Sequence, residues 1–199
     1  KNSGNEVLFV DENFSISSLK RYFTNSEYAL VSDLLKIKDK KKKIISYDVN
    51  SIRKIILVSI KKNTTNSEAE NLGAKFFNIF KDSKQNIYKL NTNIIPNRLK
   101  NFIGYFLHGL KLKSYSFDKY KTKKEKNNLF FNVFGKNNIS FKDQIKFKSI
   151  EEGIFYARDL VSEPGNILHP DEYAKRISSL KKLGLKINIY DEKKLKKLG

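Results

Sequence analysis

The stretch KIILVSI, residues 54–60, is an almost unbroken run of β-branched and aliphatic side chains. A strand that is covered on both faces has this composition, because neither face meets water. The segment that follows, 66–80, has the spacing of an amphipathic helix. Its apolar stripe is predicted to be Leu72, Phe76, Ile79 and Phe80. A doubly buried strand followed by an amphipathic helix predicts a layered α/β domain.

Strands and helices are expected to alternate through the rest of the first 148 residues. The apolar runs predict strands at 7–10, 44–49, 86–90 and 129–134. Apolar residues at helical spacing predict helices at 26–36 and 97–112. The pattern therefore favours an α/β fold, and we expect residues 1–148 to form a first domain.

A second organisation begins at residue 149. Ser149 to Glu152 has the S-x-x-E pattern of a capping box that opens a helix. Pro164 and Gly165 break that helix, and Pro170 is placed to be the first residue of the next one. The alternation in 185–190 predicts a strand, followed by a short helix. Because a lone strand and helix lack neighbours to bury their apolar sides, we expect 149–199 to begin a second domain.

The overall composition narrows the class of protein. The 199 residues are 39% hydrophobic, which is enough for a core, and contain no cysteine, so thiolate metal sites and thiol nucleophiles are excluded. The longest apolar runs are far too short to span a membrane, so we predict no transmembrane segment. The run 7–10 ends at Asp11 and Glu12 and does not resemble a signal peptide, which favours the cytoplasm.

The formal net charge of +19 raises the alternative of a basic domain that binds nucleic acid. The charge comes from 35 lysines against only 5 arginines. Nucleic-acid readers favour arginine for bidentate contacts. The charge is therefore better explained by lysines at surface positions that have no specific role, and binding of nucleic acid remains the second hypothesis.

No complete set of catalytic or metal-binding side chains is found in the sequence. The only histidines are His108 and His169, without a second histidine at metal-ligand spacing. His108 is expected to be a satisfied or surface helix residue, and His169 an N-cap or turn residue. Gly104 and Gly109 stand too far apart to cradle a phosphate. We therefore predict no catalytic, metal-binding or cofactor-binding residue within 1–199.

Two further segments have both a structural and a functional interpretation. In Lys119–Lys124, lysines interleave with Tyr120, which suits either a polyanion-binding loop or a solvated loop with lysine stems on aromatic rings. Glu163 is either a buried ligand or acid, or a residue that bonds backbone amides at a helix end, with Asn166 forming an Asx turn. The structural interpretation is favoured for both.

Residues 157–174, ARDLVSEPGNILHPDEYA, resemble the hinge segment of the leucyl aminopeptidase family, whose pattern is roughly A-R-D-L-V-N-E-P-x-N-x-L-T-P-x-x-x-A. Gly109 with Ser114–Lys121 resembles the family's G-x-x-L-x-x-Y-x-F-D-x-Y-K, and 185–199 resemble its next strand and helix. Ser162 and His169 depart from the usual Asn and Thr or Ser, at positions where capping chemistry tolerates the change. Ser59–Lys61 replaces a glycine-rich strand end.

The resemblance implies a two-domain metalloaminopeptidase that removes amino-terminal residues from peptides. It implies a macrodomain-like N-terminal domain with a mixed central sheet flanked by helices, and then, from 149, the hinge and the start of the catalytic domain. It also implies two divalent metal ions, Mn or Zn, bound downstream of this segment, and a homohexamer. The segment 1–199 is then expected to be inactive alone, with a structural and assembly role.

Overall fold

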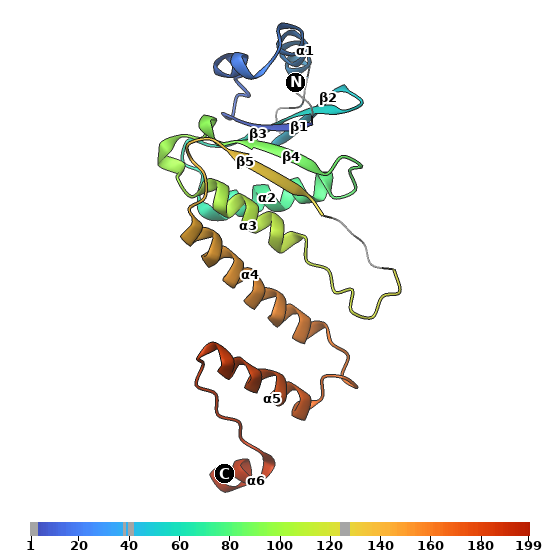
Figure 1. Cartoon of the computed structure of the whole chain (residues 1–199), viewed down its shortest axis with the longest axis vertical. Coiled ribbons are helices and arrows are strands. Elements are labelled where there is room, and N and C mark those ends of the chain that lie inside the picture. Colours follow the sequence, from blue (N-terminus) through green and yellow to red (C-terminus); the bar gives the residue numbers. More distant parts are fainter. Residues whose placement is uncertain (1–3, 38, 40–41, 124–127) are drawn as a thin grey trace. The chain divides into compact units, whose positions relative to one another are not determined.

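The computed structural model describes residues 4–37, 39, 42–123 and 128–199. The chain forms two compact units, Lys1–Glu152 and Gly153–Gly199 (Figure 1). The long helix α4 (Phe141–Ser162) runs through the boundary between them. Within the described ranges, no helix combines the length and apolarity that crossing a membrane would demand.

The first unit is built on a five-stranded mixed sheet with the order β2-β3-β1-β4-β5. Its strands are β1 (Asn5–Val10), β2 (Ile44–Asn50), β3 (Arg53–Ser59), β4 (Ile87–Asn91) and β5 (Phe130–Phe134). Strand β2 pairs antiparallel with β3, and the other neighbours are parallel. The predicted α/β fold with a mixed central sheet is confirmed, and β3 is buried almost throughout, as its composition predicts.

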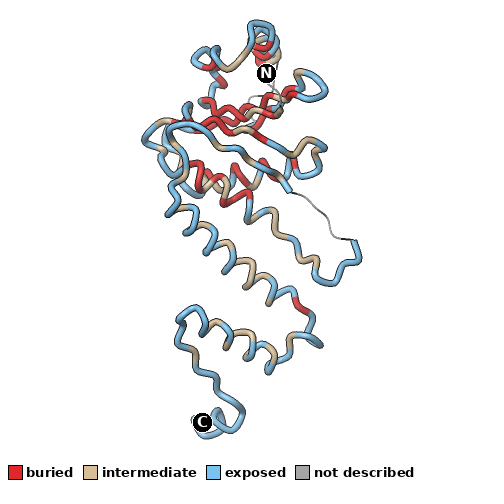
Figure 2. The backbone as a smooth tube through the Cα atoms, viewed as in Figure 1, coloured by how far each residue is buried: buried red, intermediate tan, exposed pale blue. Residues whose placement is uncertain are grey.

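Helices cover both faces of this sheet (Figure 1). On one face lie α1 (Asn25–Lys36) and the 3₁₀ helix η1 (Ser17–Tyr22), packed on the even-numbered side chains of β1. On the other lie α2 (Asn66–Phe80) and α3 (Phe102–Lys113), packed on Val7 and Phe9. Two short 3₁₀ helices, η2 (Thr92–Ile94) and η3 (Asn97–Leu99), connect β4 to α3. Figure 2 shows the buried residues gathered in the sheet and its flanking helices.

Helices α2 and α3 approach so closely that two glycines are required. A Cβ atom added at Gly73 would overlap the carbonyl oxygen of Phe106, and one at Gly109 would overlap that of Glu70. The close approach brings Phe76 and Phe106 into an edge-to-face contact, with their ring centroids 5.7 Å apart. Such aromatic pairs stabilise a fold by more than the burial of their apolar surface alone would. Gly109 is therefore a packing residue.

Some expected details of the first unit were wrong. Ile79 was assigned to the apolar stripe of α2, but it is 54% exposed and Phe77 is buried instead. The helix expected at 97–112 begins at Phe102, after η3. The capping box predicted at Ser149 opens no helix, because α4 already begins at Phe141, where the Ser140 hydroxyl accepts from the backbone N–H of Asp143 at 3.1 Å.

The second unit contains the end of α4, then α5 (Pro170–Ser179), the 3₁₀ helix η4 (Leu180–Leu183) and α6 (Glu192–Leu198). Pro170 is in the first turn of α5, as predicted, and Gly184 ends η4 with a φ of 86°, which glycine adopts easily. Asp191 caps α6 by accepting from the backbone N–H of Lys194 at 2.8 Å. The strand predicted at 185–190 is absent, because none of the described strands pairs with that segment.

Candidate functional site

The sequence candidates are dispersed. Within the described ranges, no three His, Cys, Asp or Glu side chains come together in a way that could hold a metal ion. His108 lies in α3 and is 5% exposed, and its Nδ1 atom is 3.0 Å from Oε1 of Glu151. His169 is the N-cap residue of α5, as predicted, although its side chain makes no capping hydrogen bond. The two histidines do not share a site.

The turn after α4 is held by an ion pair. The side chain of Glu163 is 1% exposed and accepts a hydrogen bond from Nη1 of Arg176 at 2.9 Å. Arg176 also donates from Nε to Glu172 at 3.0 Å. The backbone of Pro164 accepts from the N–H groups of residues 167 and 168, whereas Asn166 makes no Asx hydrogen bond. Glu163 is thus bound by an arginine, which supports the structural interpretation of this residue.

The described part of Lys119–Lys124 favours the structural interpretation. Lys119 places its Nζ atom 5.7 Å from the ring centroid of Tyr120, and Lys121 pairs with Asp118 at 2.9 Å. Tyr120 packs edge-to-face on Phe117. Lys124 lies outside the described residues. These lysines therefore cover aromatic rings and meet a carboxylate, which is typical of a solvated loop.

A crevice of about 410 Å³ lies at the carboxyl ends of the parallel strands β1, β3 and β4. Ligands of open α/β sheets bind at such edges, so this crevice is the natural place to look for a site in the first unit. Three of its charged side chains already have structural partners: Asp11 accepts from two backbone N–H groups, Arg98 donates to the carbonyl of Lys62 at 2.7 Å, and Lys61 pairs with Glu68 at 2.8 Å. The crevice does not assemble an acid–base or nucleophilic set.

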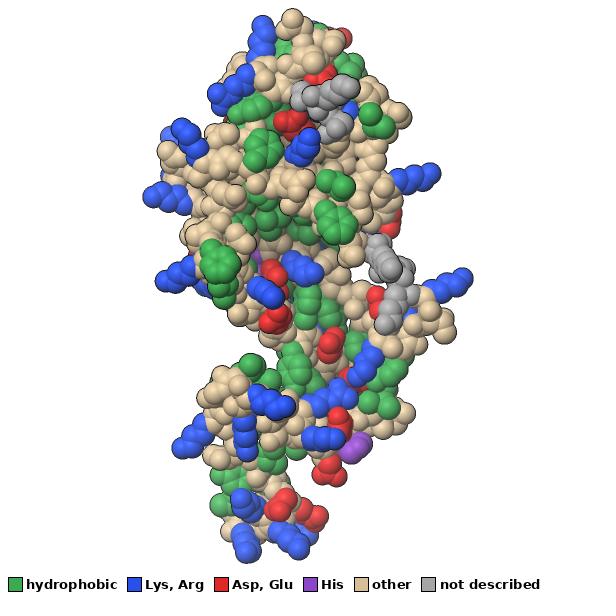
Figure 3. All heavy atoms as spheres, in the orientation of Figure 1, with side chains coloured by type: hydrophobic (Ala, Val, Ile, Leu, Met, Phe, Trp, Pro, Cys, Tyr) green, Lys and Arg blue, Asp and Glu red, His purple; other side chains and the backbone are tan. Residues whose placement is uncertain are grey.

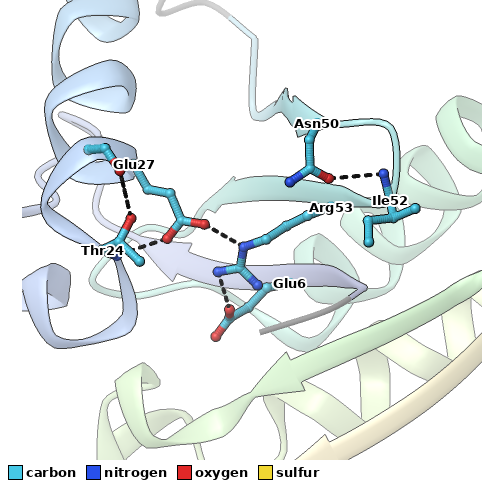
Figure 4. Close-up of polar contacts among 7 residues, drawn as sticks. Glu6, Thr24, Glu27, Asn50, Ile52 and Arg53 are labelled. Atoms are coloured by element: carbon cyan, nitrogen blue, oxygen red, sulfur yellow. Dashed lines mark hydrogen bonds and ion pairs between the residues drawn. The ribbon is translucent and has the colours of Figure 1, made fainter. Parts of the chain in front are cut away.

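The most buried ionic cluster was not predicted. Arg53, at the start of β3, is 4% exposed and lies between two carboxylates (Figure 4). Its Nε atom donates to Glu27 of α1 at 2.5 Å, and its Nη2 atom donates to Glu6 of β1 at 3.2 Å. Glu27 also accepts from the backbone N–H of Thr24 at 2.8 Å, which closes the capping box of α1. The cluster joins α1 to the sheet.

The two carboxylates of this cluster differ in their proton affinity. Burial acts to raise the pKa of Glu27, but hydrogen bonds from Arg53 and Thr24 outweigh it and leave that pKa lowered. Burial also acts to raise the pKa of Glu6, and there the attraction of Arg53 does not compensate, so that pKa is raised. Arg53 therefore stabilises the charge on Glu27 more effectively than the charge on Glu6.

Substituting each carboxylate by glutamine should reveal opposite pH dependences. The lowered pKa of Glu27 contributes stability above its unfolded pKa, and this is lost as the pH falls through the folded value. The raised pKa of Glu6 contributes stability at low pH, which is lost as the pH rises. The stability difference between wild type and Glu27→Gln should shrink from pH 7 to pH 4, and that for Glu6→Gln should grow. Urea unfolding at both pH values measures this, and parallel trends would refute the assignment.

Comparison with known proteins identifies the relatives of this chain. Over 98 residues it is 40% identical to a protein named probable cytosol aminopeptidase from Bradyrhizobium sp., a match that covers 46% of this chain and 19% of that protein. The match to the protein of the same name from Chelativorans sp. is 37% over 97 residues, covering 46% and 20%. About half of this chain is thus similar in sequence to proteins named cytosol aminopeptidase. The resemblance seen in the sequence is thereby confirmed.

Solved structures share the fold of this chain. A mutant of tomato leucine aminopeptidase matches with a TM-score of 0.74 at 16% identity, covering 100% of this chain and 44% of the tomato chain. The cytosol aminopeptidase from Coxiella burnetii gives 0.62 at 13% identity, with 92% and 36% covered. The bottromycin maturation enzyme BotP, solved also in complex with Mn, gives 0.68 at 14% identity, with 100% of this chain and 40–41% of that chain covered. No family model matches.

These matches cover only part of the length of the related proteins. The matched part of this chain spans about a fifth of the length of the curated relatives. The comparisons do not support the nucleic-acid alternative, and Figure 3 shows lysine and arginine side chains scattered over the visible face of the first unit rather than gathered in one patch. A dedicated nucleic-acid surface needs such clustering.

Proposed function

We propose that this chain is the N-terminal portion of a metal-dependent leucyl aminopeptidase that releases N-terminal amino acids from peptides. The observation that carries the proposal is the 40% identity over 98 residues to a protein named probable cytosol aminopeptidase. The fold shared with tomato leucine aminopeptidase along the whole chain adds to it. The names of these relatives also favour the cytoplasm as the location and peptides as the substrates.

Residues 1–148 serve as the N-terminal domain in this proposal, and 149–199 serve as the hinge and the start of the catalytic domain. The division of the chain into compact units at Glu152 and Gly153 supports a boundary close to this one. Within 153–199, all of which the structure describes, Glu163 is the only buried residue, whereas Val161 is 87% exposed and Leu183 76% exposed. A segment that buries so little of its own apolar surface suits the role of one part of a larger domain.

The described residues do not fit a two-metal centre. They bring together no cluster of three or more carboxylate or imidazole ligands, and the buried carboxylates of the first unit are committed to Arg53. Divalent ions are held by such clusters of oxygen and nitrogen ligands. We therefore assign the two ions, Mn or Zn, to residues downstream of this segment. The Mn complex of BotP is consistent with a divalent ion in this fold family.

The role of this segment is structural. Its N-terminal sheet and helices form one compact unit, to which we assign the task of supporting assembly into a homohexamer. The activity belongs to the catalytic domain.

Hydrolysis of leucyl-p-nitroanilide tests the proposal. The complete protein should cleave this substrate when supplied with Mn²⁺, and a chelator should abolish the cleavage, whereas a protein limited to residues 1–199 should be inactive. The 1–199 chain should retain the circular dichroism of an α/β fold, so that its inactivity is not a consequence of unfolding. Cleavage by 1–199 alone, or undiminished cleavage after chelation, would contradict the proposal.

A further inference from the structure

The two edge strands of the sheet differ in their protection against pairing with another chain. Strand β2 carries Asp48, which pairs with Lys54 at 3.2 Å, and its pairing with β3 is irregular between Asp48 and Asn50. Charges and irregularities of this kind discourage the addition of a further strand. Strand β5, at the other edge (Figure 1), reads FFNVF, without a charge or a proline, and pairs regularly with β4 along its length. β5 is therefore the edge that another strand can extend.

Alternate residues of β5 direct their backbone groups away from the sheet. The N–H of Phe130 donates to the carbonyl of Asn86 at 2.8 Å, and the carbonyl of Phe134 accepts from the Thr92 hydroxyl at 3.0 Å, so both residues face the rest of the sheet. Because the direction alternates along a strand, residues 131 and 133 present their N–H and C=O groups to the open side. The described residues contain no strand that pairs with β5 on that side. An added strand would find two donors and two acceptors there.

The side chains at this edge expose apolar surface. The register places Phe130 beside Ile87, and these side chains are 54% and 55% exposed, while Phe134 on the same face is 40% exposed. Among the described residues, the core cluster under α1 and η1 draws on β1, β2 and β3 and not on β4 or β5. On the opposite face, Phe131 and Val133 are partly buried against the other core cluster. One face of the sheet thus stays uncovered at β5.

We propose that β5 pairs antiparallel with β5 of a second copy of this chain, about a twofold axis through Asn132. Residues 131 and 133 of one copy then exchange four backbone hydrogen bonds with residues 133 and 131 of the other, which is the pattern that their outward groups allow. Phe130 lies opposite Phe134 of the second copy on the uncovered face. Aromatic pairs in direct cross-strand positions stabilise a sheet.

The sequence of β5 suits its own copy better than an unrelated peptide. In FFNVF, the order of phenylalanine, apolar residue, asparagine, apolar residue and phenylalanine is the same in both directions. Antiparallel pairing therefore sets aromatic against aromatic, and Asn132 against its counterpart, whose amide both donates and accepts. A twofold contact of this kind closes on itself and forms no filament.

The charge of the chain points to the same surface. A formal net charge of +19 opposes the approach of two copies over most of their surface, whereas β5 contributes no charge. The inference rests on the assembly role proposed for this segment, to which it adds a defined interface. The peptidase activity does not depend on it.

Disulfide formation in the complete protein measures this pairing. Residues 1–199 contain no cysteine, so an introduced cysteine has a unique position in this segment. In Asn132→Cys, the two cysteines lie directly opposite each other, with Cα atoms about 4.5 Å apart, which a disulfide can span. Asn128→Cys is the matched control at the same edge, because in this register its counterpart lies roughly 25 Å away.

Mild oxidation followed by mass spectrometry of the linked peptides gives the result. We expect the 132–132 disulfide to be at least ten times more abundant in Asn132→Cys than the 128–128 disulfide in Asn128→Cys. Equal yields, or no 132–132 disulfide, would overturn the proposal. An edge covered by another segment of the complete protein or by a different protein gives the second of these outcomes.

A second substitution on the Asn132→Cys background tests the aromatic pairs. Phe130→Lys should lower the yield of the disulfide about tenfold, because it removes a ring from each cross-strand pair and adds a positive charge to each copy. Ile87→Lys adds the same charge on the same face, at an equally exposed position one strand further from the edge, and should leave the yield unchanged. Equal yields in these two variants would contradict the pairing.

Hydrolysis of leucyl-p-nitroanilide by the same samples keeps this inference separate from the proposed function. Cleavage of the substrate without the 132–132 disulfide would contradict the pairing of β5 alone. The disulfide without cleavage would contradict the aminopeptidase activity alone.

Discussion

Replacing Arg53 by methionine should destabilise the first unit by about 3–5 kcal/mol, because the change leaves Glu6 and Glu27 buried without their cation. The loss should appear as a lower midpoint of urea unfolding, followed by circular dichroism at pH 7. Removing one partner of a buried ion pair lowers the stability by far more than the intact pair adds to it. The remaining charge is shielded from water and no longer has an opposite charge beside it.

Lys54→Met is the matched control for Arg53→Met. Lys54 is the next residue on β3 and pairs with Asp48 at 3.2 Å, but the Asp48 side chain is 75% exposed. An exposed pair contributes about 1 kcal/mol or less, so this variant should unfold close to wild type. Equal losses in the two variants would show that the cluster around Arg53 is solvated and that its burial is wrongly described.

Gly73→Ala is expected to cost about 3 kcal/mol, because the new methyl group would overlap the carbonyl oxygen of Phe106. Helices α2 and α3 would have to separate, and the contact between Phe76 and Phe106 would open. The overlap is with backbone, so no side-chain rotation can relieve it. Urea unfolding measures the loss of stability, and the near-ultraviolet signal of the aromatic cluster reports the change in packing.

Gly153→Ala makes the same chemical change at a position where we expect no loss of stability. Gly153 lies inside α4, and a Cβ atom added there would meet no atom within 4 Å. Alanine favours helix over glycine by about 1 kcal/mol, so this variant should be at least as stable as wild type. If Gly73→Ala were also neutral, the close approach of α2 and α3 would be refuted.

The elements of the first unit were predictable because their signals are local. The buried strand β3 shows itself in the composition of 54–60, and α2 coincides with the predicted range 66–80. Thr65 and Glu68 form a capping box at its start, which fixes that boundary through residues only three apart. A local signal gave the wrong helix start where two such signals occur close together. The S-x-x-D pattern at Ser140 and the S-x-x-E pattern at Ser149 both suit the start of a helix, and α4 begins at the earlier of the two.

The Arg53 cluster could not be read from the sequence. Its partners are 47 and 26 residues away, and an arginine at the start of a strand looks like a surface residue. The pairing of His108 with Glu151 is equally remote, at a separation of 43 residues. The alternation of apolar and polar residues in 185–190 led to the wrong prediction of a strand for a related reason. A strand needs a neighbouring strand to pair with, and the local sequence does not show whether one is present.

The assignment of function depended on a different kind of signal. The stretch 157–174 resembles a family because many of its positions match the family's pattern in order. In the structure, the residues of this stretch have ordinary structural roles: Glu163 binds Arg176, and Pro170 starts α5. Those roles position helices and carry out no chemistry. The residues therefore carry the resemblance to the family without supplying a reaction.

Digestion of a defined peptide by the complete protein tests the central claim most directly. A peptide with a free amino-terminal leucine and its N-acetylated twin are incubated with the Mn²⁺-loaded protein, and the products are followed by mass spectrometry. We predict stepwise loss of single residues from the free amino terminus and no cleavage of the acetylated peptide. Internal cleavage, or no cleavage of either peptide, would contradict it.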